Sequence, residues 1–186
     1  MNINTKKSYG GHIAIKILFV VFFLLCANTL FAQIQTKILG CRVGTSTANE
    51  VMAILNQQGY TVYYLGQHSF FSASGQIRSC GEDYNIRGSI LFGGICWDGV
   101  TFTFVGGKLA RVSFVCIEKD GYSKLLSDLK NKYSRYYEKH MFFEGFRDGY
   151  TEISLITGGS LSLAYSNIKL QDAMYGGAYS GGASDL

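Results

Sequence analysis

Proline is absent from this chain, and the absence limits how the backbone can turn. Without the fixed φ angle of proline, reversals depend on glycine, asparagine and aspartate, and glycine is abundant, with 23 of 186 residues. Tryptophan occurs once, as Trp97, which we expect to pack in the core or at a sheet edge. Tyrosine occurs 13 times, and its ring suits half-buried sheet surfaces and binding surfaces alike.

The spacings that mark metal and phosphate sites are also missing. No Cys-x-x-Cys pair occurs, and only His68 and His140 follow the N-terminal segment, so no zinc site is expected. The pair Glu82-Asp83 is too small a set for a calcium loop. No glycine pair follows a strand and opens a helix, as a phosphate cradle requires. We therefore expect no metal, no cofactor and no catalytic residues. A cysteine hydrolase that uses Cys80 with His68 is the enzymatic alternative.

The first 32 residues have the layout of a secretory signal peptide. An apolar run covers 17–25 and the small residue Ala32 precedes Gln33, so cleavage between these two is predicted. The positive start consists of Lys6, Lys7 and Lys16. The run is shorter than the roughly 20 residues needed to cross a bilayer, which disfavours a membrane anchor. Lipidation at Cys26 is disfavoured because Leu25 is not small. We expect export to the periplasm or the extracellular space.

Cleavage leaves residues 33–186, which hold 14 of the 17 basic residues against 13 acidic ones, a net charge of about +1. This balance gives no pull towards nucleic acid, and contact with a membrane is expected only through an uncleaved signal segment. The segment 119–139 is locally basic, but acidic residues are interspersed, so we interpret it as a solvated helix face.

The first half reads as a helix over 44–59 followed by strands. Thr47 and Glu50 form a capping box, and Gly59 is a natural stop. Strands are predicted at 60–65, 85–92, 96–104 and 108–117, with a long polar loop over 66–83. Side-chain parity requires an odd number of residues between the last two strands. A three-residue loop, Val105 to Gly107, would pair Phe102 with Ala110 and Cys96 with Cys116.

The second half repeats this plan. A helix is predicted over 121–137, with strands at 140–146, 150–156 and 160–167. Ile153 and Leu155 should face the apolar positions of the last strand, which are Leu161, Leu163 and Tyr165. The repetition suggests an internal duplication, with chance similarity between amphipathic helices as the alternative.

The predicted fold class is α+β, with helices on one face of one or more antiparallel sheets. The opposite face is polar in both halves: Thr101, Thr103, Arg111 and Ser113 in the first, Glu152, Ser154, Ser160 and Ser162 in the second. Four segments result: a signal peptide 1–32, a first α+β unit 33–118, a second unit 119–168, and a flexible tail 169–186 rich in glycine and serine.

The segment Gly44-Thr45-Ser46-Thr47-Ala48-Asn49-Glu50-Val51, leading to Leu55 and an aromatic meander, carries a resemblance to known families. It is similar to small exported bacterial domains of the β-lactamase-inhibitor-protein type and to small α+β outer-membrane assembly lipoproteins. It also resembles uncharacterised secreted proteins of Bacteroides-like bacteria. The resemblance covers 39–167 and implies a non-catalytic, protein-binding or envelope module. This chain departs from it by lacking a good lipidation site and by the 66–83 loop, which has no counterpart in the second half.

Four cysteines follow the signal segment: Cys41, Cys80, Cys96 and Cys116. An even number in an exported protein suggests two disulfides, for which three connectivities exist. The predicted strand pairing favours Cys96–Cys116, which leaves Cys41–Cys80. Buried free thiols are the alternative, because free cysteine packs well as a small apolar residue.

The function expected from these patterns is a non-enzymatic module that binds another envelope or secreted protein through an exposed sheet surface. The alternative is a binder of small ligands or glycans that uses the 66–83 loop. A protein binder should present a broad exposed patch, whereas a ligand binder should present an enclosed pocket with a few polar groups.

Overall fold

The computed structural model describes residues 33–71 and 77–174, without the side chains of 70–79. The signal peptide 1–32 with its cleavage site at Ala32, and the part of the predicted tail from 175 onward, lie outside the described residues. The described residues from Ile34 to Met174 belong to one compact unit. Among the described residues, no helix is both long and apolar enough to span a membrane.

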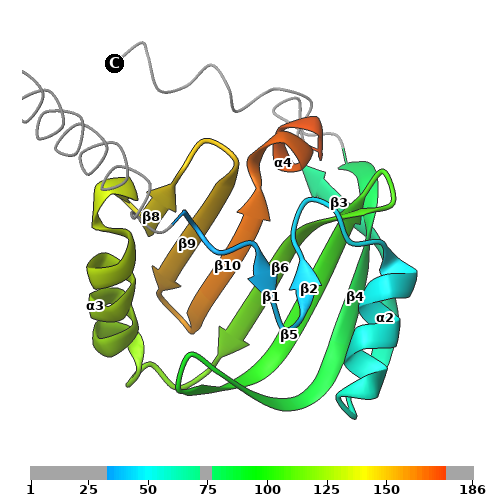
Figure 1. Cartoon of the computed structure of the whole chain (residues 1–186), viewed down its shortest axis with the longest axis horizontal. Coiled ribbons are helices and arrows are strands. Elements are labelled where there is room, and N and C mark those ends of the chain that lie inside the picture. The colour runs from blue at the N-terminus through cyan, green and yellow to red at the C-terminus, as the bar shows by residue number, and fades with distance from the viewer. Residues whose placement is uncertain (1–32, 72–76, 175–186) are drawn as a thin grey trace, which may run out of the picture. The chain divides into compact units, whose positions relative to one another are not determined.

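The fold is α+β, and its main element is one eight-stranded sheet in which all neighbouring strands are antiparallel (Figure 1). The strand order is β3-β4-β5-β6-β10-β9-β8-β7. The first four strands are β3 (Val62–Phe71), β4 (Ile77–Phe92), β5 (Ile95–Val105) and β6 (Lys108–Cys116). The others are β7 (Tyr137–Lys139), β8 (Glu144–Arg147), β9 (Thr151–Thr157) and β10 (Leu161–Asn167). A small separate sheet pairs β1 (Lys37–Ile38) with β2 (Cys41–Arg42).

The two predicted units share this sheet. Each half is a helix followed by a four-stranded meander, and the last strands of the two meanders, β6 and β10, pair with each other. Helix α2 (Ala48–Gln57) precedes the first meander, and helix α3 (Tyr122–Tyr133) with a 3-10 turn (Ser134–Tyr136) precedes the second. The repeated order agrees with the plan read from the sequence, while a duplication event stays a prediction.

The predicted capping box of α2 is present. The Glu50 amide donates to Thr47 Oγ1 over 3.4 Å, and the Thr47 amide donates to Glu50 Oε2 over 2.8 Å. These bonds satisfy two amides that an uncapped helix start would leave without partners. The hydrogen bonds to Thr47 also lower the pKa of the Glu50 carboxyl. Helix α2 therefore begins at Ala48, four residues later than the predicted boundary.

The predicted polar loop over 66–83 is wrong, because most of this segment is strand. β3 and β4 pair from Val62↔Ile86 to Phe71↔Ile77, with register shifts after Tyr64 and after His68. The two strands are joined by their backbone pairing, which needs no apolar alternation in the sequence.

The predicted β5–β6 register is also wrong. Val105 pairs with Lys108 across a two-residue turn, Gly106-Gly107, in which both residues have positive φ, 56° and 73°. Such a turn favours glycine at both positions. A register shift after Thr103 then restores the parity, so that Phe102 faces Val112 rather than Ala110.

This register removes the geometric argument for a Cys96–Cys116 disulfide. Cys96 lies opposite Leu91 and Cys116 lies opposite Leu161. In the structure Cys41, Cys80, Cys96 and Cys116 are all free thiols.

The predicted pairing of the last two strands is confirmed, and Ile153 and Leu155 share a face with Leu161, Leu163 and Tyr165. The structure adds the register, in which Leu163 lies opposite Leu155 and Tyr165 lies opposite Ile153. The strand expected at 140–146 is instead interrupted, since β7 ends at Lys139 and β8 begins at Glu144.

The main core is a cluster of buried residues from the large sheet, from β1 and β2, and from helices α2 and α3. Phe114 on β6 is fully buried, stacks on Phe92 at 4.6 Å between ring centroids, and lies 5.4 Å from the ring of Trp97. Trp97 is also fully buried, and its Nε1 donates to the Phe92 carbonyl, so the expected packing role is confirmed. The helices contribute Val51, Leu55, Leu125, Leu129 and Tyr133.

The tail predicted from residue 169 begins as a helix. Helix α4 (Ile168–Met174) starts with the Leu170 amide donating to Asn167 Oδ1. Its Met174 is buried against Val105 and Ala110 in a cluster separate from the main core. Burial of Met174 holds α4 against the sheet, so the flexible tail predicted from residue 169 is wrong for residues 169–174.

Candidate binding face

The face of the sheet that carries no main-core residue, here called the outer face, is lined by polar side chains in rows. Strand pairing aligns one row across six strands: Asp83, Thr103, Arg111, Ser166, Glu152 and Arg147. The neighbouring row consists of Asn85, Thr101, Ser113, Ala164, Ser154 and Gly145. The polar positions predicted separately for the two halves therefore form one surface. Ser160 is the exception, because it lies in the β9–β10 turn.

Asp83 ties three strands of this face together. The Thr103 hydroxyl of β5 donates to Asp83 Oδ1 over 2.6 Å, and His68 Nδ1 of β3 lies 2.8 Å from Asp83 Oδ2. Thr103 is buried, and the side chains of His68 and Asp83 are 23% and 20% exposed. A carboxylate only accepts hydrogen bonds, so Nδ1 serves as the donor. This arrangement stabilises the β3–β5 region, since both oxygens of one carboxylate are engaged.

Two further polar atoms on the outer face are buried without a hydrogen-bond partner among the described residues. They are Arg111 Nε and Asn85 Oδ1, one in each row. A buried polar atom without a partner costs free energy, and atoms with so little accessible surface can bond to another protein only if their side chains move. Helix α4 contributes a third such atom, Gln171 Oε1.

The ends of the strands away from α4 carry exposed apolar side chains. Leu91, Val115 and Ile156 are 74%, 42% and 37% exposed, and Ile117, directly after β6, is 75% exposed. Val115 and Ile156 both lie beside Ser162, and Leu91 lies beside the exposed Cys96. We call Leu91, Val115, Ile117 and Ile156 the apolar end of the sheet. Apolar side chains grouped on an exposed surface mark interaction sites more often than scattered ones do.

The cysteines show no sign of activation. Burial raises the pKa of the Cys80 thiol, and the charge of Asp83 raises it further. Burial raises the pKa of Cys41 to about 11 and also raises that of Cys116. A thiol that keeps its proton is a weak nucleophile. Cys80 packs at the α4 cluster with Met174, which favours a packing role over the hydrolase alternative.

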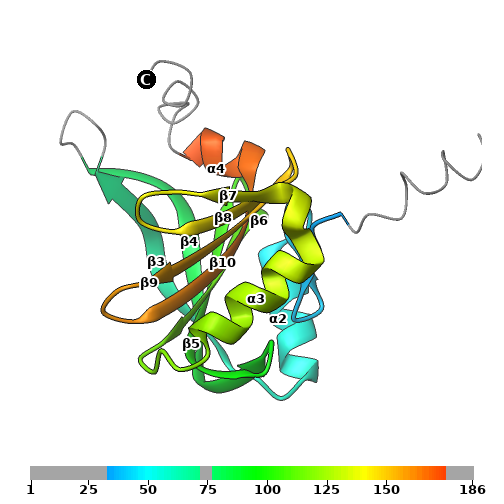
Figure 2. The same ribbon diagram turned by 90° about the vertical axis from the view of Figure 1, so that its left-hand side faces the viewer.

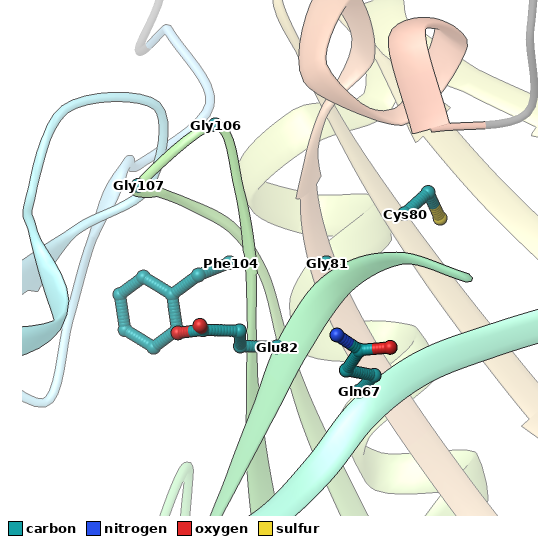
Figure 3. A pocket seen from close by; sticks show the side chains of 7 residues that line it. All are labelled: Gln67, Cys80, Gly81, Glu82, Phe104, Gly106 and Gly107. Atoms are coloured by element: carbon teal, nitrogen blue, oxygen red, sulfur yellow. The ribbon is translucent and has the colours of Figure 1, made fainter.

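A shallow pocket of about 380 Å³ lies at the base of the β3–β4 hairpin (Figure 3). Its lining consists of Gln67, Cys80, Gly81, Glu82, Phe104, Gly106 and Gly107. Figure 3 shows Glu82 and Phe104 together, with the Cys80 sulfur pointing elsewhere. The Phe104 side chain is only 2% exposed, so its ring offers no stacking platform for a ligand. Two of its three glycines, Gly106 and Gly107, form the β5–β6 turn, and the third, Gly81, lies in β4 against the Phe104 backbone.

Glu82 and Asp83 do not act as a pair. As neighbours in a strand they point to opposite faces: Asp83 bonds to Thr103, and Glu82 Oε2 accepts from the Tyr84 hydroxyl. Over the part of the chain that the structure describes, no group of three or more His, Cys, Asp or Glu side chains could hold a metal ion.

Sequence reasoning identified the hydroxyl-bearing positions of this face but missed its extent. The alternation of polar residues indicated Thr101, Thr103, Arg111 and Ser113, whereas Asp83 and Asn85 were assigned to a loop or its boundary. The apolar end was missed because Leu91 and Val115 alternate with buried residues in strands that look apolar throughout. Only the pairing of β6 with β10 brings Val115 and Ile156 to either side of Ser162.

No family model matches this chain, and neither a curated protein nor a solved structure does.

Proposed function

We propose that the protein is an exported, non-enzymatic module that binds another envelope or secreted protein through the outer face of its sheet. Helices α2 and α3 belong to the opposite side of the sheet in this proposal. Their apolar residues share the main core with one sheet face, and in Figure 2 both helices lie to the right of the strands. The outer face is then available to a partner except where α4 packs.

The observation that carries the proposal is the apolar end lying next to the polar rows. Protein interfaces combine a desolvated apolar centre with a polar rim, and the outer face offers both within one sheet. Leu91, Val115 and Ile156 would supply the apolar centre. The half-buried Thr101, Ser113 and Ser154 would supply hydrogen-bonding groups at the polar rim.

A binder of small ligands or glycans is the second candidate, and the pocket at Gln67 and Glu82 is the observation in its favour. It ranks second because the pocket is shallow and its one aromatic ring, Phe104, is buried. Ligand sites are usually concave and enclose most of the ligand surface.

Affinity capture from the native envelope fraction tests the proposal. The bait is the tagged protein, compared with a Val115→Asp/Ile156→Asp double variant and with Met141→Asp, a control at the fully exposed β7–β8 loop. We expect a stoichiometric protein that the wild type and the control retain and the double variant loses. With that partner purified, the double variant should raise its Kd by about tenfold or more, as the loss of a central apolar contact does.

Two results would contradict the proposal. Retention of the partner by the double variant with unchanged Kd would place the interface elsewhere. Recovery of only sugar or lipid, together with loss of that ligand in a Glu82→Gln variant, would favour the second candidate instead.

A further inference from the structure

The chain that follows the predicted cleavage site is held to the domain almost from its first residue. The Ile34 side chain is 2% exposed and belongs to the main core. Its amide donates to Asp148 Oδ2 over 3.1 Å, and the Gln35 amide donates to the Tyr133 hydroxyl over 3.3 Å. Burial and backbone hydrogen bonds therefore fix the path of the chain from Ile34 onward.

The carboxylate that holds Ile34 is itself held by the backbone. Asp148 Oδ1 accepts from the amides of Tyr150 and Thr151 over 3.0 and 2.8 Å, in the connection between β8 and β9. With the Ile34 amide on Oδ2, three backbone donors occupy a carboxylate that offers roughly four acceptor positions. Little of this carboxylate remains to bind a charged chain end.

Gln33 differs from the residue that follows it. It is exposed and lies outside the helices and strands, whereas Ile34 is buried. Removal of residues 1–32 can only increase the exposure of Gln33, because it takes atoms away. A chemical change at Gln33 therefore leaves the core contacts of Ile34 in place.

A glutamine at the start of a chain can react with itself. Its α-amine, with an ordinary pKa of about 8, is partly unprotonated near neutral pH. The neutral nitrogen attacks Cδ of the side-chain amide, so that an N–Cδ bond forms and the Cδ–Nε2 bond breaks. The product is a five-membered lactam, pyroglutamate, and ammonia leaves with the proton that the amine gives up. No oxidant, reductant or co-substrate takes part.

We propose that Gln33 of the processed chain is converted to pyroglutamate. The inference rests on the export proposed above, with cleavage between Ala32 and Gln33. Two features support it: Gln33 is exposed, and the chain is anchored from Ile34, so that ring closure breaks no buried contact. Conversion removes the positive charge of the amino terminus together with the free amine that aminopeptidases bind. The mature protein then begins with a neutral ring beside an anchored residue.

Mass spectrometry of the protein from its native envelope fraction tests this modification. After trypsin digestion we expect an N-terminal peptide 33–37 that is lighter than the open sequence by one ammonia and carries no label at its α-nitrogen after amine modification. An isotope-labelled open peptide of the same sequence, added at lysis, should keep its glutamine. A Gln33→Asn variant would have to close a four-membered ring and should keep its free amine. The matched Gln35→Asn variant should cyclise as the wild type does.

The possible results separate cyclisation from export. A peptide that starts at Gln33 with an open glutamine overturns the cyclisation and leaves export intact. A native peptide no more cyclised than the added control overturns it as well. A chain that starts at another residue, or that keeps residues 1–32, overturns the cleavage and the cyclisation together. The capture experiment with the Val115→Asp/Ile156→Asp variant tests the partner surface independently of these results.

Discussion

The two halves of the molecule have the same order of elements, a helix followed by four strands, but they differ in strand length and in side-chain contacts. The first half uses long strands, of which β4 has 16 residues, whereas the strands of the second half have three to seven. The first helix begins with a complete capping box, but α3 begins at Gly121 without a side-chain cap. The first half also holds the Asp83 bonds and the edge-to-face contacts of Tyr84 with Phe104 and Tyr64. The comparison teaches that polar side-chain bonds centred on Asp83 add to the backbone pairing of the first half, whereas β9 and β10 in the second half pack mainly through buried residues.

The largest loss of stability is expected from a substitution in β6, where the two halves of the sheet pair. Phe114 on β6 is fully buried and packs on Phe92 and Trp97, while its strand pairs with β10. Phe114→Ala should lower the free energy of unfolding by about 3–5 kcal/mol, through lost burial and a new cavity. Chemical denaturation should still show one transition when followed by tryptophan fluorescence and by circular dichroism. Two separated transitions would mean that the halves fold independently, contrary to a shared sheet.

An intermediate effect should distinguish the polar contacts of the two halves. Asp83→Ala removes the carboxylate that accepts hydrogen bonds from Thr103 and His68. The buried Thr103 hydroxyl loses its acceptor, which should lower the free energy of unfolding by about 2 kcal/mol. The matched change in the second half is Glu152→Ala. It breaks a 3.9 Å contact with the half-exposed Arg147 and should change stability by less than about 0.5 kcal/mol. Urea titrations of both variants make the comparison, and equal losses would refute the role given to Asp83.

A smaller effect concerns the capped helix. Thr47→Ala removes the hydroxyl that accepts from the Glu50 amide and should destabilise the protein by about 1 kcal/mol. Thr47→Ser, which keeps the hydroxyl, is the control and should change little. The melting temperatures of the two variants test this prediction. If Thr47→Ala has the same melting temperature as the wild type, the capping box contributes no measurable stability, and the difference in capping between α2 and α3 does not affect stability.

The parts of the fold that the sequence predicts are those fixed by short-range chemistry. Thr47 and Glu50 define a helix start within four residues, and side-chain parity predicts which residues of β9 and β10 share a face. The β5–β6 register was missed because parity does not distinguish a three-residue loop from a glycine pair followed by a register shift. Parity alone therefore predicts which side chains of β5 and β6 share a face, but it does not predict which residues pair across the two strands.

Long-range pairings account for the remaining misses. Nothing local in β6 indicates β10 as its neighbour, so the single outer face could not be derived. The β3–β4 hairpin lacks apolar alternation, so its polar residues look like a loop, although backbone pairing makes most of the segment strand. Helix α4 depends on one buried side chain, Met174, in a segment whose composition otherwise suits a tail.

Labelling of Cys96 tests the central claim, that the outer face of one continuous sheet is the partner surface. Cys96 is exposed beside Leu91 in the structure, whereas Cys41 is fully buried with a raised pKa. In the free protein a maleimide should modify Cys96 rapidly and Cys41 only after unfolding. Saturation with the captured partner should slow the labelling of Cys96 at least tenfold. A Cys96 that is never labelled, or is labelled equally fast in the complex, would contradict the account.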